Sequence, residues 1–280
     1  MEKAIKRYFP IFVLPPMIAF TLGFIIPFAE GVYLSFCKFT TVNDAKFIGL
    51  SNYAKVFKDS TFVHAFWYTA AFTVVSVILI NVLAFAVALL LTKGIKGTNV
   101  FRTVFFMPNL IGGIVLGYIW QLLLNGILMK FSRTLTYSST FGFWGLVILM
   151  CWQQIGYMMI IYIAGIQNIP GELIEAAEID GATKRQVLKS VTIPMVMPSI
   201  TVCTFLTLTN SFKLFDQNLA LTNGEPSKMS EMLALNIFNT FYGRAGYEGV
   251  GQAKAVIFFI LVAAIALTQN YLTRRKEVQQ

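Results

Sequence analysis

One stretch of the sequence, residues 169–194, combines acidic, small and helix-breaking residues at spacings that suit contact with another protein. It reads IPGELIEAAEIDGATKRQVLKSVTIP. Pro170 breaks a preceding helix, and the acids over 172–180 suit the positive N-terminal end of a new one. Gly181 can supply the left-handed turn that ends this helix, and the Thr-x-x-Gln capping box at 183–186 starts another. The stretch therefore predicts a helix–turn–helix whose small residues let another backbone approach closely.

Two groups of neutral polar residues lie inside long apolar runs, and their spacing could serve hydrogen bonding to a polar solute. Polar side chains within membrane spans are costly and usually face the interior of the bundle. Within each group the members are three or four residues apart, which places them on one helix face. The competing interpretation is hydrogen bonding between helices, and the spacing does not exclude it. The candidates for substrate contact are Gln154, Tyr157, Thr207, Asn210 and Ser211, with Asn81, Asn109, Trp120 and Trp152 as weaker ones.

No residue pattern indicates catalysis or a resident cofactor. The cysteines, Cys37, Cys151 and Cys203, are far apart and lack metal-ligand spacing, and the lone His64 has no neighbouring cluster. The sequence has no Gly-x-x-x-x-Gly-Lys-Ser/Thr phosphate loop, so ATP would have to be bound by a separate chain. A membrane-embedded transferase is the remaining enzymatic alternative, but helix capping already explains the acids of 172–180. We therefore expect a non-enzymatic chain without metal or cofactor.

The elements that position these residues are predicted to be membrane-spanning helices. The chain has 280 residues, is 56% hydrophobic and only 12% charged, whereas soluble domains carry about a quarter charged residues. Barrel strands would alternate polar and apolar residues, which these unbroken apolar runs do not. Six charge-free runs approach or exceed the roughly 20 residues that a spanning helix needs. The sequence predicts an all-α, six-helix bundle with helices near 8–28, 65–91, 104–124, 142–166, 195–213 and 255–272.

The basic residues indicate lipid contact and an orientation. The net charge of +9 is scattered in short groups between apolar runs, whereas nucleic-acid binding needs one basic face. Positive residues concentrate on the cytosolic side of membrane proteins. With both termini cytosolic, the inside segments hold twelve of the 22 Lys and Arg residues in about half the length of the outside segments. These segments are 1–7, 93–102, 172–189 and 274–280.

Further predictions concern the N-terminal run and the segments between the runs. The first run follows basic residues, as a signal peptide does, but its prolines and the lack of a cleavage site indicate a retained span. Residues 49–57 suit a short surface helix capped by Ser51 or Asn52, and 232–243 is too short to span. Lys213 and Asp216 are expected at the outer membrane boundary.

The 169–194 segment resembles the EAA loop of binding-protein-dependent ABC permeases, whose pattern is Glu-Ala-Ala, Asp-Gly-Ala and then Leu-Pro or Ile-Pro. The matching residues are Glu175, Ala176, Ala177, Asp180, Gly181, Ala182, Ile193 and Pro194. Arg185 and Leu188 depart from it, since the sugar branch often has aromatics there. Residues 164–170 resemble the sugar-permease Ala-Gly-Leu-Gln-x-Ile-Pro. Similar resemblances occur at 102–108 and 215–226, so they cover nearly the whole chain.

The resemblance implies a type I ABC importer permease for a sugar or oligosaccharide in the bacterial cytoplasmic (inner) membrane. Its implied partners are a second homologous permease in a heterodimer, two cytosolic ATPase subunits and an extracellular or periplasmic solute-binding protein. In that family the EAA loop docks on the ATPase, which implies a coupling role for Glu175, Ala176, Ala177, Asp180, Gly181 and Ala182.

The expected organisation has three parts. Residues 1–64 hold the N-terminal tail, the first span and an outer loop; 65–273 form the permease core with the coupling loop 169–194; and 274–280 form a basic cytosolic tail. Glycerol phosphate is the alternative cargo. A phosphate would need Arg or Lys facing the pathway, and the predicted spans show none well inside, which favours a neutral sugar.

Overall fold

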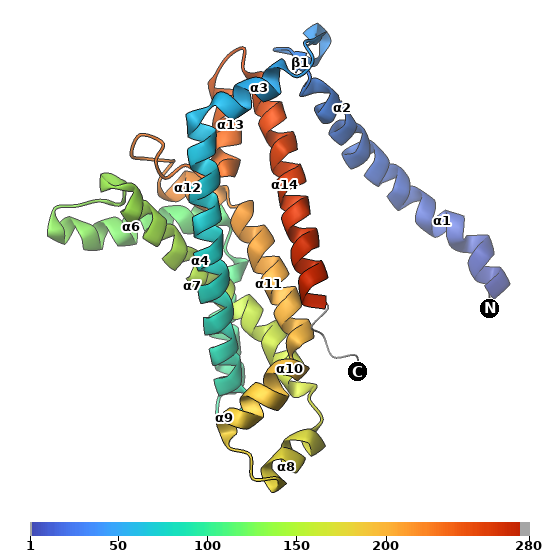
Figure 1. Ribbon diagram of the computed structural model, residues 1–280, viewed down its shortest axis with the longest axis vertical. Helices are drawn as coiled ribbons and strands as arrows, with labels where there is room; N and C mark the ends of the chain where they lie inside the picture. The colour runs from blue at the N-terminus through green and yellow to red at the C-terminus, as the bar shows by residue number, and fades with distance from the viewer. Residues whose placement is uncertain (1, 275–280) are drawn as a thin grey trace. The chain divides into compact units, whose positions relative to one another are not determined.

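The computed structural model describes residues 2–274 and divides into two compact units. Residues 1–60 and 237–260 make the first unit, and residues 61–236 and 261–280 make the second. Most of the described chain is helical (Figure 1). Five helices are long and apolar enough to cross a membrane, and a bent pair brings the number to six. The expected all-α architecture with six spans is therefore confirmed; the predicted tail beyond residue 274 lies outside the described residues.

The first unit begins with a long helical stretch. It consists of α1 (Glu2–Phe20), a π-helical turn (Thr21–Ile25) and α2 (Ile26–Leu34). The predicted span at 8–28 was placed correctly but ended too early, because Glu30 was taken as a boundary and the helix continues past it.

A small module of two strands and a helix follows this stretch. Strands β1 (Cys37–Lys38) and β2 (Lys46–Phe47) pair antiparallel around a 3-10 turn (Val42–Asp44), and α3 covers Ser51–Lys58. The N–H groups of Thr40 and Thr41 donate to Asp44, which lowers the pKa of that carboxyl below its usual value.

The predicted cap of α3 was wrong. Its N-cap is Leu50, and no side chain bonds there. The Asn52 amide instead donates to the carbonyl oxygens of Ser35 and Cys37, at 2.9 and 2.8 Å. Asn52 is therefore used to attach the helix to the hairpin.

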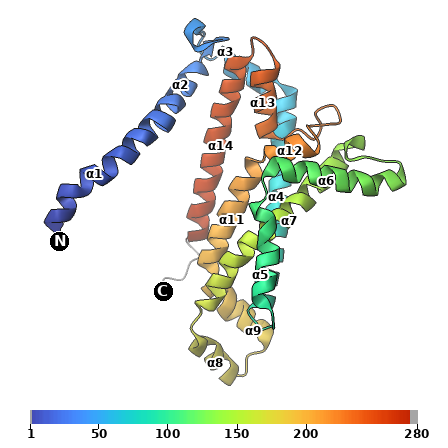
Figure 2. The same cartoon turned by 180° about the vertical axis from the view of Figure 1, so that it is seen from behind.

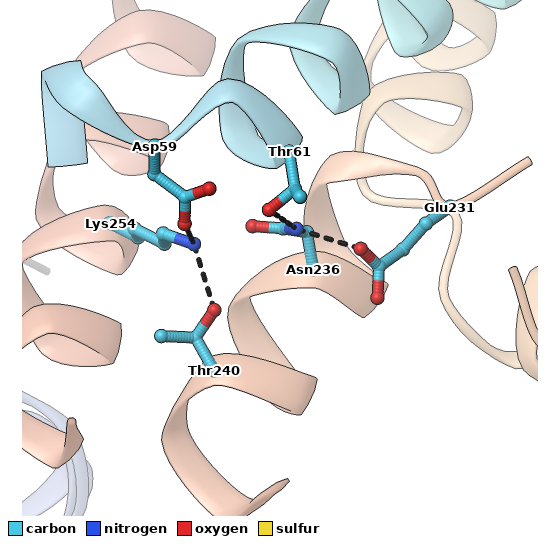
Figure 3. Close-up of polar contacts among 6 residues, drawn as sticks. All are labelled: Asp59, Thr61, Glu231, Asn236, Thr240 and Lys254. Carbon is cyan, nitrogen blue, oxygen red and sulfur yellow. Dashed lines mark hydrogen bonds and ion pairs between the residues drawn. The ribbon is translucent and has the colours of Figure 1, made fainter. Parts of the chain in front are cut away.

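A buried lysine explains why the last span is longer than predicted. Helix α14 covers Glu248–Arg274, not 255–272. Lys254 lies inside it with no exposed surface, and its Nζ is 2.8 Å from both Asp59 Oδ2 and Thr240 Oγ1 (Figure 3). A paired, hydrogen-bonded charge can be kept in a helix interior, so a charge-free run was too strict a criterion for a span.

The second unit is arranged around α7 (Ser139–Gln167), which carries many of the buried residues. Helix α5 (Thr98–Phe106) packs on α7 where Gly156 faces the backbone of Phe105, and a side chain at Gly156 would collide with that carbonyl. Helix α4 (Ser60–Leu91) lies almost wholly in this unit, and α13 (Leu233–Gly243) and α14 have residues in both.

The predicted helix at 104–124 was wrong, because the chain is broken there. A 3-10 turn (Met107–Leu110) follows α5, and Gly112 is extended before α6 (Gly113–Leu128) starts. Helix α6 runs across the direction of α7 (Figures 1 and 2) and packs against α12 (Asp216–Leu221). A Cβ added to Gly117 would lie 2.6 Å from that of Ala220, so glycine permits this close contact.

The fifth span is bent. After α8 (Gly171–Ile179), the chain forms α9 (Lys184–Val187), a π-helical turn (Leu188–Thr192), α10 (Ile193–Met195) and α11 (Met197–Phe212). The helical stretches Lys184–Met195 and Met197–Phe212 meet at an angle of 68°. The remaining short turns of this unit are 3-10 turns at Met129–Phe131 and Leu135–Tyr137.

Candidate functional site

The loop that connects α7 to α11 has the local structure that its sequence predicts. Helix α8 starts directly after Pro170, and Gly181 has φ +79°, in the left-handed region. The N–H of Thr183 donates to Gln186 Oε1 at 2.7 Å, and the N–H of Gln186 donates back to Thr183 Oγ1 at 3.4 Å. Reciprocal bonds of this kind satisfy the free N–H groups at a helix start. The capping box and the glycine turn are therefore confirmed.

This loop exposes most of its surface. No residue of α8 is buried, and the side chains of Glu175, Ala176 and Asp180 are exposed. A Cβ added to Gly181 would meet nothing within 4 Å. A recess of about 300 Å³ beside the glycine turn includes Ala177, Asp180, Gly181 and Ala182 in its lining. Helix α8 and the turn after it, residues 171–183, are called the elbow. The elbow thus offers small side chains and open space to another molecule.

A polar pocket of about 260 Å³ lies between α7 and the C-terminal end of α11. Two of the predicted substrate residues line it: Gln154 from α7 and Asn210 from α11, with Asn210 Nδ2 3.5 Å from Gln154 Oε1. Its lining carries one cation, Lys213, and one carboxylate, Asp216. Amide groups can bind hydroxyl groups as both donor and acceptor.

The segment after α11 also reaches this pocket. Gln217 lines it and donates to Gln153 Oε1 at 2.8 Å, while Gln153 donates to the carbonyl of Ile111 at 3.3 Å. Sequence reasoning missed Gln217, because it lies in a short helix outside the apolar runs. Gln217 lies just beyond the predicted span at 195–213, and no motif in the sequence marks it as a pocket residue.

A second polar cluster on the same helices is closed. Asn81 of α4 donates to Thr207 Oγ1 at 2.8 Å and accepts from the Tyr162 hydroxyl at 2.6 Å. The Thr207 hydroxyl also donates to the carbonyl of Cys203. Thr207 is fully buried and does not line the pocket. This arrangement is the interhelical bonding that was the alternative interpretation.

The two remaining candidates lie outside the pocket. Ser211 is fully buried, and within the described chain its hydroxyl has no hydrogen-bond partner. Tyr157 is half-buried, with its ring centroid 6.4 Å from that of Phe106. The structure therefore brings Gln154 and Asn210 together and leaves Tyr157, Thr207 and Ser211 elsewhere. Within residues 2–274, no group of three or more His, Cys, Asp or Glu side chains could hold a metal ion.

Comparison with known proteins decides the family. Residues 80–278 match the family described as binding-protein-dependent transport system inner membrane component. The chain belongs to this family. It is therefore a transport component of the inner membrane and not an enzyme.

Two curated relatives and one solved structure illustrate the similarity. The chain is 43% identical, over 96% of its length and 94% of the relative's, to a probable starch degradation products transport system permease protein (AmyD) of Thermoanaerobacterium thermosulfurigenes. It is 29% identical, over 99% of both chains, to the multiple sugar-binding transport system permease protein MsmF of Streptococcus mutans. A bacterial ABC transporter involved in alginate import shares its fold, with a TM-score of 0.81, 20% identity and 98% coverage of each chain. The expected type I importer permease architecture is thus confirmed.

Proposed function

We propose that this permease carries a neutral sugar or oligosaccharide through the membrane. The observation that carries the proposal is the polar pocket, in which Gln154 and Asn210 lie beside a lining with one cation and one carboxylate. The formal charge of that lining is zero, and its amides suit hydroxyl groups. The names of the two relatives, which refer to starch degradation products and to multiple sugars, support the same cargo.

The exposed elbow is proposed to couple transport to ATP hydrolysis by a separate ATPase subunit. Its small residues let a partner's backbone approach, and its left-handed glycine turn keeps it compact. Residues Glu175, Ala176, Ala177, Asp180, Gly181 and Ala182 would make or shape that contact. This role places the elbow and both termini in the cytosol. It also calls for two ATPase subunits, a second permease and a solute-binding protein on the outer side.

The bent fifth span offers a mechanical route between the two sites. Lys184 begins the lower arm next to the elbow, and Asn210 lies near the end of the upper arm in the pocket lining. Movement of the elbow on ATPase closure would therefore change the surroundings of Asn210. Alternating access needs such an element with two arrangements that the partners bias.

Tyr157, Thr207 and Ser211 remain predicted sugar contacts for a conformation in which the helices have separated. The buried hydroxyl of Ser211, which has no partner within the described chain, supports this for one of them, since an unpaired buried polar group is costly.

Glycerol phosphate is less well suited to the pocket. A phosphate needs an excess of positive charge, and the carboxylate of Asp216 offsets the ammonium of Lys213 within the same lining. A membrane-embedded transferase would require a cluster of acidic or metal-binding groups, and the described residues offer no metal cluster.

Reconstitution of the complete importer in vesicles tests the proposal. The complex contains the chain, a second permease, the ATPase and the binding protein, and ATP-dependent uptake is measured for labelled maltooligosaccharides and glycerol 3-phosphate. We expect uptake of the sugars, with KM raised about three- to tenfold by Gln154→Ala or Asn210→Ala, as for one lost hydrogen bond. The control is Thr209→Ala, because the Thr209 hydroxyl bonds within its own helix. Uptake of glycerol 3-phosphate instead of sugar would overturn the cargo.

A further inference from the structure

A third cavity, of about 770 Å³, lies where α4 and α7 end beside the elbow. Its floor is apolar and includes Leu89, Ile166 and Leu188. The end of α4 and helices α8 and α9 lie at the same end of this unit (Figure 1). Because α4 stops at Leu91 and α7 at Gln167, two spans leave the membrane here. The cavity therefore lies at the boundary between acyl chains and lipid headgroups.

The rim of this cavity is positively charged. Lys93, Lys184 and Arg185 line it, against a single carboxylate from Glu178. All three cations are exposed, and within residues 2–274 none of them forms an ion pair. The lining thus has a formal excess of two positive charges that no neighbouring carboxylate neutralises. An apolar floor under a cationic rim fits a ligand that has both an acyl chain and a phosphate.

The two departures from the EAA pattern both line this cavity. Arg185 and Leu188 stand where sugar permeases often have aromatic residues, and each contributes to the lining. An aromatic ring at 188 would occupy space that leucine leaves open, and one at 185 would remove a rim charge. The cavity is consequently larger and more basic than the usual residues at these positions would make it.

We propose that this cavity binds an anionic phospholipid of the adjoining leaflet, with its phosphate at the basic rim and an acyl chain over the apolar floor. This inference rests on the proposed function for the cytosolic location of the elbow. Anionic lipids concentrate in the cytoplasmic leaflet and attract Lys and Arg near the membrane surface. A bound lipid would contact the ends of α4 and α7 together with α9. Lipid composition would therefore set how firmly the elbow is held against the spans.

The test uses the complete importer, purified and placed in bilayer nanodiscs of phosphatidylcholine with or without phosphatidylglycerol. Native mass spectrometry counts the phosphatidylglycerol molecules retained, and sugar-stimulated ATPase activity is measured in parallel. We expect the double variant Lys184→Gln/Arg185→Gln to weaken retention about fivefold for each charge removed, since a basic side chain near an anionic surface contributes about 1 kcal/mol. Stimulation by phosphatidylglycerol should fall with it.

Two further variants separate the site from general effects. Lys189→Gln removes an exposed charge from the same loop but outside the cavity lining, and should leave retention unchanged. Leu188→Trp should reduce retention by filling the floor without changing any charge. It keeps the proposal testable if the double variant does not assemble.

Three results would overturn the lipid assignment. The first is wild-type retention in both the double variant and Leu188→Trp. The second is displacement of phosphatidylglycerol by inorganic phosphate alone, which would indicate a soluble phosphate compound. The third is loss of the ATPase subunits from the double variant with unchanged lipid retention, which would assign the cavity to ATPase contact. Absence of sugar transport by the wild type in every lipid would instead count against the proposed function, and the retention measurement would still stand.

Discussion

The segments on either side of α11 connect it to its neighbours, and they differ in how far their polar groups are bonded within the chain. Before α11, no residue of α8 is buried. After α11, Asn218 is fully buried; its amide nitrogen donates to the Ser230 carbonyl at 2.8 Å and to Thr222 Oγ1 at 3.0 Å, and its oxygen accepts from the N–H of Met232 at 2.9 Å. In the segment after α11, these buried polar groups thus find their hydrogen-bond partners within the segment itself.

The same contrast extends to acidic residues. Glu231, beside Met232, is 1% exposed and accepts a hydrogen bond from Asn236 at 2.7 Å, while Asn236 also contacts Thr61 (Figure 3). Glu172 and Glu175 on α8 are exposed. Buried polar groups are costly unless bonded, so the segment after α11 depends on these hydrogen bonds for its own stability. The polar side chains of the elbow are exposed and need no partner within the chain. A docking protein can therefore determine the conformation of the elbow.

The largest effect is expected from Gly181→Asp. Transport should fall more than tenfold while the amount of inserted and assembled subunit stays the same. The chain leaves the space around Gly181 empty, so any steric clash must come from the partner that docks there. The left-handed backbone of Gly181 adds some strain, but aspartate and asparagine tolerate this conformation better than most residues. ATP-dependent uptake and membrane abundance are measured on the same vesicles.

Gly181→Asn is the matched variant, since asparagine also tolerates the left-handed backbone but carries no charge. Asparagine fills the same space as aspartate, so Gly181→Asn should also lose most of its transport. Equal, wild-type transport in both would contradict a docking role for the elbow.

A smaller effect, on stability, is expected from Asn218→Leu. This change leaves the N–H of Met232 and the carbonyl of Ser230 without their partner, at a cost of about 1–3 kcal/mol for a buried group. The melting temperature of the purified complex should fall by several degrees, while transport per folded molecule is kept. The exposed Asn99, whose side chain has no hydrogen bond within the described residues, provides the control Asn99→Leu, which should change neither quantity. A loss of transport without a loss of stability would show that the segment after α11 is not merely structural.

The smallest effect is expected from Thr183→Ala. Loss of an N-cap costs about 0.5–2 kcal/mol of helix stability, but the elbow's partner can restore order on docking. Because this cost is small, transport should drop no more than about threefold. Amide hydrogen exchange of residues 184–187 should accelerate, since the start of the helix opens more often. Thr183→Ser keeps the cap and should behave as wild type. A loss as deep as that of Gly181→Asp would mean that helix order itself limits coupling.

Much of the fold could be predicted, because the length of an apolar run indicates a spanning helix and because helix-breaking residues act on their immediate neighbours. Pro170, Gly181 and the Thr183–Gln186 capping box behave as their chemistry requires. The errors have equally physical causes. Lys254 is neutralised by a partner far away in the sequence. The break before α6 coincides with Pro108 and the Gly112-Gly113 pair, which are helix-breaking signals that the criterion of charge-free runs did not include.

The candidate site could be predicted less completely. Gln154 and Thr207 are both polar residues in apolar helices, and the sequence offers the same signal for each. Only the structure separates them, because Thr207 is bonded to Asn81 while Gln154 lines a pocket. That distinction depends on which helices are neighbours, which spacing within one helix cannot show.

The two helical stretches Lys184–Met195 and Met197–Phe212 join the elbow to the pocket, and this limits how the number of residues between them can change. Each residue of a helix turns the next by about 100°. One inserted or deleted residue within 184–209 would therefore swing the Asn210 amide away from Gln154 while leaving the elbow intact. Length variation among natural versions of this segment should accordingly be far rarer than residue replacement.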